Sequence, residues 1–314
     1  MRTPVAITLA AILSWTALVA ASRVLLLRLG LDPWAFSFVQ LVAGGGVLLA
    51  AGGRKRLDLS SFRRPSTWIL GVFRVLSGAS YTAVLAWISV LEAGVLAAVN
   101  VPMVAAAVWL AFGRRPARGE WLGHLAIGIA ILPLVASLEG GLRHPAVGLM
   151  LFNEVCLVAG TLLAERHPDN LSDEPGARLR FTGAVLLVTG ALFLAIRLAQ
   201  AGIVGGLAGS ATDIAWSWPL LIWGTVVGVA LRAPSMVLSF WSARLVGAQN
   251  YMAAASLLPV LGMLLEQAAF AGGLIDVSRF RPETAVLALG IVAGTLLVVA
   301  ARLRERRAAA SPPR

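Results

Sequence analysis

The chain has 314 residues, of which 59% are hydrophobic and 13% are charged, and its formal net charge is +11. A water-soluble domain of this length cannot bury so much apolar surface, so the composition indicates an integral membrane protein. The basic residues are spread over short loops between apolar runs, which argues against a nucleic-acid partner. The single cysteine, Cys156, excludes an internal disulfide, and with only three histidines we expect neither a metal site nor a cofactor.

Apolar runs of about 20 residues, the length that an α-helix needs to cross a bilayer, recur along the whole chain. They are apolar throughout rather than alternating, as the strands of a membrane barrel would be. We therefore predict an all-α integral membrane protein with ten transmembrane helices. The predicted spans are 5–27, 33–51, 68–90, 94–112, 120–138, 147–164, 181–201, 217–243, 250–271 and 284–301.

Lysine and arginine are distributed unequally between the two sets of loops. If the N-terminus is cytoplasmic, most of them lie in inward-facing segments, including 54–56, 63–64, 114–118 and 302–307. The outward-facing segments then hold only Arg23, Arg28, Arg143, Arg279 and Arg281. Basic loops stay in the cytoplasm, so we predict a multi-pass protein of the cytoplasmic (inner) membrane with both termini inside the cell.

Two long stretches, Gly71 to Gly113 and Gly228 to Gly273, each predict two successive helices and resemble one another. Each has an arginine followed three residues later by a serine, and each has a proline in its second helix. The matching residues are Arg74 and Ser77 with Pro102, and Arg232 and Ser235 with Pro259. We predict two five-helix repeats, residues 1–145 and 146–314, with a junction loop at 165–180. Because five is odd, the second repeat would be inverted in the membrane, as in many secondary transporters.

Ten spans in two halves, the apolar runs around the two prolines, and the segments AIGI at 126–129 and ALGI at 288–291 resemble the EamA-like transporters. These belong to the drug/metabolite transporter (DMT) superfamily, and the resemblance covers about Val5 to Leu303. It implies a central cavity, lined by spans 1, 3, 4, 6, 8 and 9, that opens alternately to the two sides. The family often has Gly-Glu after spans 4 and 9, where this chain has Gly113-Arg114 and Gly272-Gly273. It also often has an arginine in span 2, where this chain has Gln40.

Charged residues within the apolar runs are the first candidates for function. A charge at mid-bilayer costs roughly 2.5–3.5 kcal/mol on insertion scales, so such residues usually mark a pathway. We predict that Arg74 and Arg232 bind the substrate, because a guanidinium matches a carboxylate or phosphate with two parallel hydrogen bonds. Alternatively, Arg74 extends to the inner interface and Arg232 pairs with a glutamate. Arg197, near the outer end of its span, is expected to extend to the interface.

Two intramembrane carboxylates are candidates for coupling transport to an ion. Glu154 stands where the first repeat has Trp15, and we predict that it binds and releases a proton. A fixed ion pair with Arg74 or Arg232 is the alternative. Glu266 lies two turns after Pro259 and is either a second coupling residue or a polar anchor near the outer interface.

Further site candidates are uncharged. Pro102 and Pro259 are predicted to kink their helices and free carbonyl groups that line a cavity, although a kink without a role is also compatible with the sequence. Four more side chains could contribute hydrogen bonds or stacking to a substrate, and helix packing explains each of them equally well. They are Trp15, Tyr81, Asn100 and Asn153.

The junction loop Glu165 to Arg180 is the one long polar segment between apolar runs, and its Pro, Asp and Gly residues predict a linker. Its residues His167, Asp169 and Asp173 could bind a metal ion. A solvated loop is the interpretation that we favour for this segment.

These features favour a secondary transporter of a small organic metabolite, such as an amino acid or organic anion, rather than an enzyme. No GxxxxGK[ST] loop is present, which argues against an ATP-driven pump. A flippase for polyprenyl-phosphate carriers, with the same fold, is one alternative. An intramembrane transferase is another, but its aspartates would be clustered, whereas here they are scattered. A scaffold without a cavity does not explain the intramembrane charges. Expected partners are the substrate, the bilayer and a proton, and a homodimer is left open.

Overall fold

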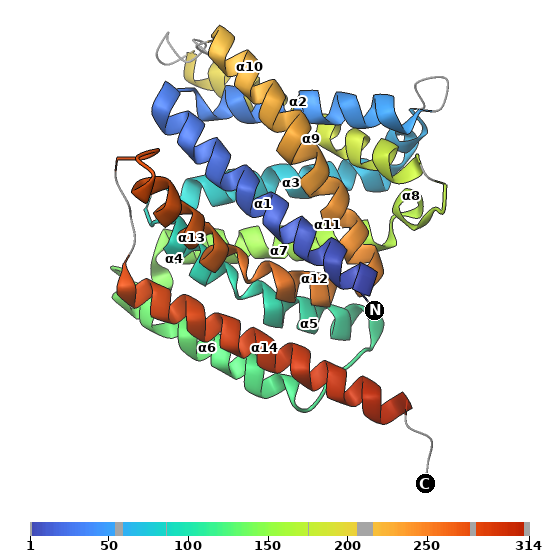
Figure 1. Ribbon diagram of the computed structural model, residues 1–314, viewed down its shortest axis with the longest axis vertical. Helices are drawn as coiled ribbons and strands as arrows, with labels where there is room; N and C mark the ends of the chain where they lie inside the picture. The colour runs from blue at the N-terminus through green and yellow to red at the C-terminus, as the bar shows by residue number, and fades with distance from the viewer. Residues whose placement is uncertain are drawn as a thin grey trace.

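The computed structural model describes residues 2–53, 59–85, 87–174, 176–205, 216–276 and 281–310. Within these ranges all regular structure is helical (Figure 1). The first seven α-helices are α1 (Arg2–Leu29), α2 (Pro33–Gly52), α3 (Pro65–Val84), α4 (Val90–Ala97), α5 (Asn100–Phe112), α6 (Glu120–Ser137) and α7 (Pro145–Arg166). The others are α8 (Pro168–Leu171), α9 (Ala177–Gly205), α10 (Trp218–Val227), α11 (Ala233–Val246), α12 (Ala248–Ala255), α13 (Leu258–Ala271) and α14 (Pro282–Ala310). Short 3₁₀ turns, η1 (Ser60–Arg63) and η2 (Gly141–Arg143), and a π-helical turn, η3 (Gly228–Arg232), complete the set.

Nine helical segments in the described ranges are long and apolar enough to cross a membrane. The chain is therefore an all-α, multi-pass membrane protein, as its sequence predicts. Three of these segments are compound: α4 continues into α5, α10 through η3 into α11, and α12 into α13. The helix α3 is not among the nine, because polar residues such as Arg74, Ser77 and Ser80 lower its hydropathy.

The predicted span 68–90 is wrong at its C-terminal end, because α3 stops at Val84. Ser89 starts a new helix there through a capping box. Its Oγ accepts a hydrogen bond from the Glu92 N–H at 3.2 Å, while Glu92 Oε2 accepts one from the Ser89 N–H at 2.7 Å. A hydropathy run does not reveal this break, because the residues on both sides of it are apolar.

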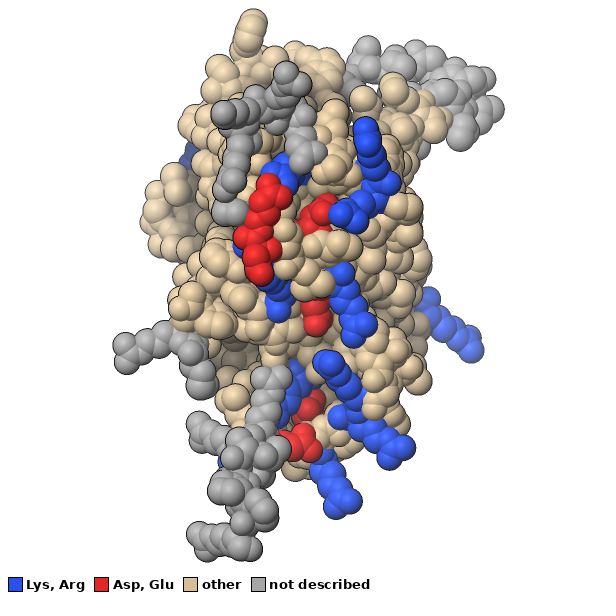
Figure 2. Space-filling view, turned by 90° about the vertical axis from the view of Figure 1, so that its right-hand side faces the viewer, with Lys and Arg blue, Asp and Glu red and all other residues tan. Residues whose placement is uncertain are grey.

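Both ends of the described chain lie on the same face of the bundle, on the right in Figure 1. The C-terminal end of α2 and the short helix α8 are on this face as well. Seen directly, the face carries many Arg side chains with a few acidic ones among them (Figure 2). Several residues used above to predict the orientation lie outside the described ranges, namely Arg54, Lys55, Arg56, Arg279 and Arg314.

Two helix pairs pack so closely that only glycine fits between them. The helix α2 lies along α9, and α6 lies along α14. A Cβ atom on Gly45 would come within 3.0 Å of the Gly183 carbonyl oxygen, and one on Gly183 within 2.8 Å of the Gly45 oxygen. Gly123 and Gly294 are related in the same way, at 2.6 and 3.0 Å. Close backbone approach through small residues is typical of helix packing in lipid.

Candidate functional site

Two arginines and one tryptophan meet inside the bundle. Arg74 lies on α3, Arg232 is the last residue of η3, and Trp15 lies on α1. The Cζ atom of Arg74 is 5.6 Å from the centroid of the Trp15 ring, and that of Arg232 is 6.0 Å from it. All three side chains are partly buried. Two cations from distant parts of the chain thus contact the same indole, which cation–π attraction favours.

Buried polar groups hold these side chains in position. Nε of Arg232 donates a hydrogen bond to Gln40 Oε1 at 2.9 Å, and Gln40 Nε2 donates one to Ser22 Oγ at 3.3 Å. The indole Nε1 of Trp15 donates one to Ser239 Oγ at 2.7 Å. Gln40 is only 1% exposed, so the surrounding helices fix its amide and, through it, the direction of the Arg232 guanidinium.

Gln40 and Ser239 were not among the predicted site residues. Two weak signals in the sequence point to them. Gln40 is the one hydrogen-bonding side chain in the run from Phe38 to Gly53. Ser239 follows Arg232 by seven residues, or two helical turns, so the regular part of a helix would place both on one face.

Neither arginine has a negatively charged partner among the residues that the structure describes. The ion pairs found there involve other side chains. Nη2 of Arg74 donates a hydrogen bond to the thioether Sδ of Met236 at 2.7 Å. The alternative that Arg232 pairs with a glutamate is therefore not found. Two guanidinium groups at one place, without an acidic partner among the described residues, are chemically suited to bind an anion.

A second polar cluster surrounds Glu154 on α7. Glu154 is fully buried, and Oε1 accepts a hydrogen bond from Asn153 Nδ2 at 2.7 Å. Ser77 Oγ in turn donates one to Asn153 Oδ1 at 2.7 Å. Ser77 follows Arg74 by three residues, so the cluster lies about one turn, or ~4.5 Å of helix rise, from the arginine site.

Two oxygen atoms in this cluster have no hydrogen-bond partner in the described structure: Oε2 of Glu154 and Oδ1 of Asn100. Both are buried, and the Asn100 side chain faces the Glu154 carboxyl group. The alternative of a fixed ion pair between Glu154 and an arginine is not found among the described residues. Tyr81, one turn after Ser77 on α3, is also partly buried. Each of these buried oxygen atoms carries a desolvation cost that no hydrogen bond offsets in this arrangement.

Glu266 lies in a different environment. Its Oε2 is 3.0 Å from Nη1 of Arg23, so this ion pair ties α13 to α1. The pair is partly buried, with side-chain exposures of 22% for Arg23 and 17% for Glu266. This arrangement is that of a polar anchor between helices, one of the two roles considered for Glu266.

The two prolines follow breaks in their helices rather than bending continuous ones. Pro102 is in the first turn of α5, and Pro259 is in the first turn of α13. A proline at that position leaves no helical N–H unsatisfied. The breaks are close in space, because a Cβ atom on Gly94 of α4 would lie 2.7 Å from Cγ of Pro259.

The first part of the junction segment is folded against the bundle, so its interpretation as a solvated loop is wrong for residues 167–170. His167 is 1% exposed and Asn170 is fully buried. The ring of His167 stacks on Phe181 at a centroid distance of 4.1 Å. Asn170 Nδ2 donates hydrogen bonds to the carbonyl oxygens of Ala164 and Phe240. No group of three or more metal-ligating side chains is found in the described residues.

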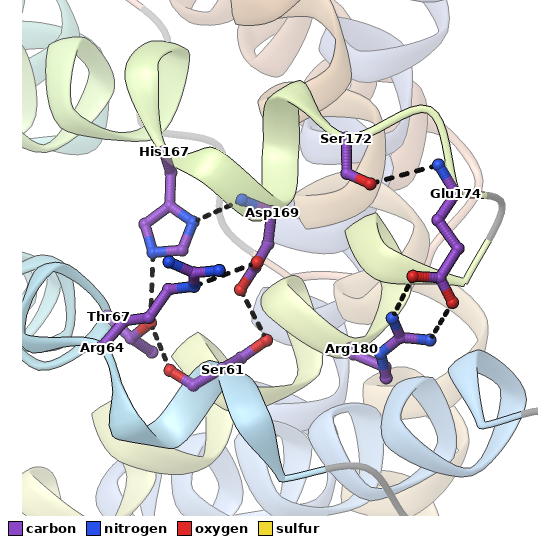
Figure 3. Close-up of polar contacts among 8 residues, drawn as sticks. All are labelled: Ser61, Arg64, Thr67, His167, Asp169, Ser172, Glu174 and Arg180. Carbon is purple, nitrogen blue, oxygen red and sulfur yellow. Dashed lines mark hydrogen bonds and ion pairs between the residues drawn. The ribbon is translucent and has the colours of Figure 1, made fainter.

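His167 joins this segment to the residues before α3 (Figure 3). The hydroxyl of Thr67 donates to the Ser61 carbonyl at 2.7 Å, so it accepts from Nε2 of His167 at 3.2 Å. Nδ1 then accepts from the Asp169 N–H at 3.3 Å. Asp169 also contacts Arg64 Nε at 3.1 Å and accepts from Ser61 Oγ at 2.8 Å.

This geometry favours a neutral imidazole. The pKa of His167 is lowered to about 4, mainly by burial; the charge of Asp169 opposes this shift and the charge of Arg64 adds to it. Protonation of the ring would add a hydrogen to Nδ1. That hydrogen would face the Asp169 N–H, which now donates to Nδ1. The junction is therefore built around an uncharged histidine.

Comparisons with known proteins bear on the fold alone. No family model matches the sequence, and no curated protein matches it. One solved structure, described only as a crystal structure of a protein, is similar over 96% of this chain and 99% of its own, with a TM-score of 0.63 and 18% sequence identity. At this level of identity the likeness shows a shared arrangement of helices over the whole chain.

Proposed function

We propose that the protein is a secondary transporter of the EamA-like (DMT) type that moves a small organic metabolite with an anionic group by alternating access. It is not an enzyme in this proposal. The observation that carries it is the meeting of Arg74 and Arg232 on Trp15 with no acidic partner in the described structure. An anionic substrate would neutralise both guanidinium groups and could be released when the helices that carry them separate.

The packing of the helices supports two inverted five-helix repeats. In this proposal α3 also crosses the membrane, so that it and the nine apolar segments of the described ranges make ten spans. If the repeats correspond, α3 is equivalent to α11 and α7 is equivalent to α1. The contact of α3 with α7 then has its counterpart in the contact of α11 with α1, and both contacts are present. The pairs α2 with α9 and α6 with α14 each join equivalent helices through mutually close glycines. Inverted repeats with a site between them are a common plan of secondary transporters.

The basic face in Figure 2 supports a cytoplasmic location of both termini, because basic segments are retained inside the cell. In this orientation the site residues Arg74 and Glu154 belong to helices that cross the bilayer in opposite directions. Glu154 is the proposed coupling residue. A proton on its Oε2 would remove the cost of burying a carboxylate oxygen that has no hydrogen-bond partner.

A ligand-stabilisation screen on the purified protein tests the proposal. The panel holds amino acids, nucleosides, sugars, organic anions and polyprenyl phosphates. We expect small organic anions to raise the melting temperature of the wild-type protein and not that of Arg232→Ala. Arg143→Ala, which removes an exposed arginine from η2, is the matched control and should respond as the wild type does. Stabilisation by polyprenyl phosphates alone would favour the flippase, and an unchanged response of Arg232→Ala would remove the arginine from the site.

A further inference from the structure

A separate pocket opens on the face opposite the termini, where α2 begins and α9 nears its end. It is a shallow, half-open pocket, and its lining side chains come from both helices and from the residue Trp216 before α10. Four of them are aromatic and one is an arginine: Trp34, Phe38, Phe193, Trp216 and Arg197. None of these residues belongs to the site around Trp15.

The aromatic walls are packed against each other. Trp34 and Phe193 stack with ring centroids 4.4 Å apart, and Phe38 meets Trp216 edge-on at 6.4 Å. The pocket is thus shaped before any ligand arrives. Tryptophan near the end of a membrane span is typical of the level of the lipid headgroups, where an apolar ring and a polar N–H are both accommodated.

Arg197 lacks the partners that a buried arginine normally has. Its Cζ lies 6.0 Å from the centroid of the Trp34 ring, and its Nε is buried without a hydrogen-bond partner. Among the described residues, it takes part in no ion pair. A buried N–H of a charged group is costly when unsatisfied, so a hydrogen-bond acceptor bound in the pocket would stabilise Arg197.

We propose that this pocket binds the phosphate headgroup of an anionic phospholipid, with Arg197 as the charge partner and the aromatic rings against the glycerol and upper acyl region. The flank of α9 beside the arginine is apolar, since Ile196 is 36% and Leu198 59% exposed. The pocket therefore opens among lipid tails and headgroups. A single guanidinium group matches the charge of one phosphate. It therefore favours an anionic lipid over a zwitterionic one, whose headgroup carries a cation that already balances the phosphate. The site is independent of the proposed transport function.

Lipid binding to the full-length, detergent-purified protein can be followed by native mass spectrometry with phosphatidylglycerol and phosphatidylcholine. We expect the wild-type protein to bind phosphatidylglycerol about fivefold more tightly, the effect typical of one basic residue near an anionic headgroup. Arg197→Gln should lose this preference, and Arg197→Lys should keep part of it. Arg143→Gln removes an exposed arginine from the same face and should keep the full preference.

The aromatic wall is tested with Trp34→Ala, which should weaken the binding of both lipids without altering their ratio. Millimolar inorganic phosphate should leave phosphatidylglycerol bound, and its displacement by free phosphate would overturn the assignment to a lipid. Equal preference in the wild-type protein and Arg197→Gln would overturn the role of Arg197 and with it the proposal.

Discussion

Arg232 and Gln40 illustrate how one residue can depend on another that the sequence hardly distinguishes. The guanidinium keeps its direction because a buried amide on another helix accepts from its Nε. A charge in an apolar run is visible without a structure, so Arg74, Arg232 and Glu154 could be predicted as candidates. Gln40 and Ser239 could not be assigned with the same ease, because their importance comes from contacts between distant segments.

Replacing Arg232 by lysine should weaken binding of the anion found in the ligand screen by about tenfold or more. Lysine keeps the charge but loses Nε, its bond to Gln40 and the planar fork, and a hydrogen bond to a charged group contributes about 1.5–3 kcal/mol. Isothermal titration of purified protein measures this. Gln40→Leu, which removes only the orienting amide, should show a smaller loss. Unchanged affinity in both variants would contradict the proposed role of Arg232 in binding the anion and that of Gln40 in orienting it.

Glu154→Gln should abolish uptake driven by a pH gradient while leaving exchange of labelled for unlabelled substrate. The amide cannot release a proton, and the substitution removes a buried carboxylate oxygen that has no hydrogen-bond partner. We therefore expect a melting temperature equal to or above that of the wild-type protein.

Glu266→Gln gives the contrast, because it breaks the ion pair with Arg23 and should lower the melting temperature, by the equivalent of about 1 kcal/mol for a partly exposed pair. Uptake in reconstituted vesicles and thermal melting of the same preparations separate the two effects. Full gradient-driven uptake by Glu154→Gln would exclude it as the coupling residue.

At the scale of helices, the contact of α2 with α9 depends on the absence of side chains. A Cβ atom on Gly45 would lie 2.8 Å from Leu187 Cγ and 3.0 Å from the Gly183 oxygen, whereas one on Gly46 would meet nothing within 4 Å. Gly45→Ala should destabilise the protein by ~1–3 kcal/mol through overpacking. Gly46→Ala, the matched control, should be neutral or stabilising by up to ~1 kcal/mol. Equal melting temperatures would show that the helices can move apart without cost.

The junction segment should make stability depend on pH. The pKa of His167 is about 4 in the folded protein and about 6.5 in an unfolded chain. Between these values the unfolded chain binds more protons, so the stability contributed by the neutral ring is present above pH 6.5 and is lost as the pH falls towards 4. Melting curves over this range should show a weaker dependence for His167→Gln, which keeps a hydrogen-bonding side chain at that position. Parallel curves for the two proteins would contradict a buried neutral histidine.

The helices themselves were largely predictable, because twenty apolar residues in sequence have few other structures available. The capping box at Ser89 and the burial of His167 were not. The first is a local arrangement between two apolar runs, and the second depends on Phe181 and Thr67, which approach only after the chain has folded. Polar residues in a loop look alike in sequence whether solvent or protein surrounds them.

For the molecule as a whole, the predicted orientation can be tested with reporter fusions. Fusions after Arg64, Arg115 and Arg178 should be cytoplasmic, and one after Arg143 external, because basic segments remain on the inner side. Alkaline phosphatase and a fluorescent protein give opposite readouts at each site. A cytoplasmic signal after Arg143 would contradict the inverted arrangement of the two halves.

The π-helical turn η3 makes the protein sensitive to chain length at one point. It holds one residue more than a regular turn, and it separates two parts of a helix that face different neighbours. Before it, a Cβ atom on Gly224 would lie 2.8 Å from Val39 Cγ1 on α2; after it, Ser242 Oγ lies 2.6 Å from Thr8 Oγ1 on α1. Removing one residue would restore a regular helix and rotate one part by about 100° against the other. A single-codon deletion here would thus act as a rotation, turning Gly224 of α10 away from Val39 of α2.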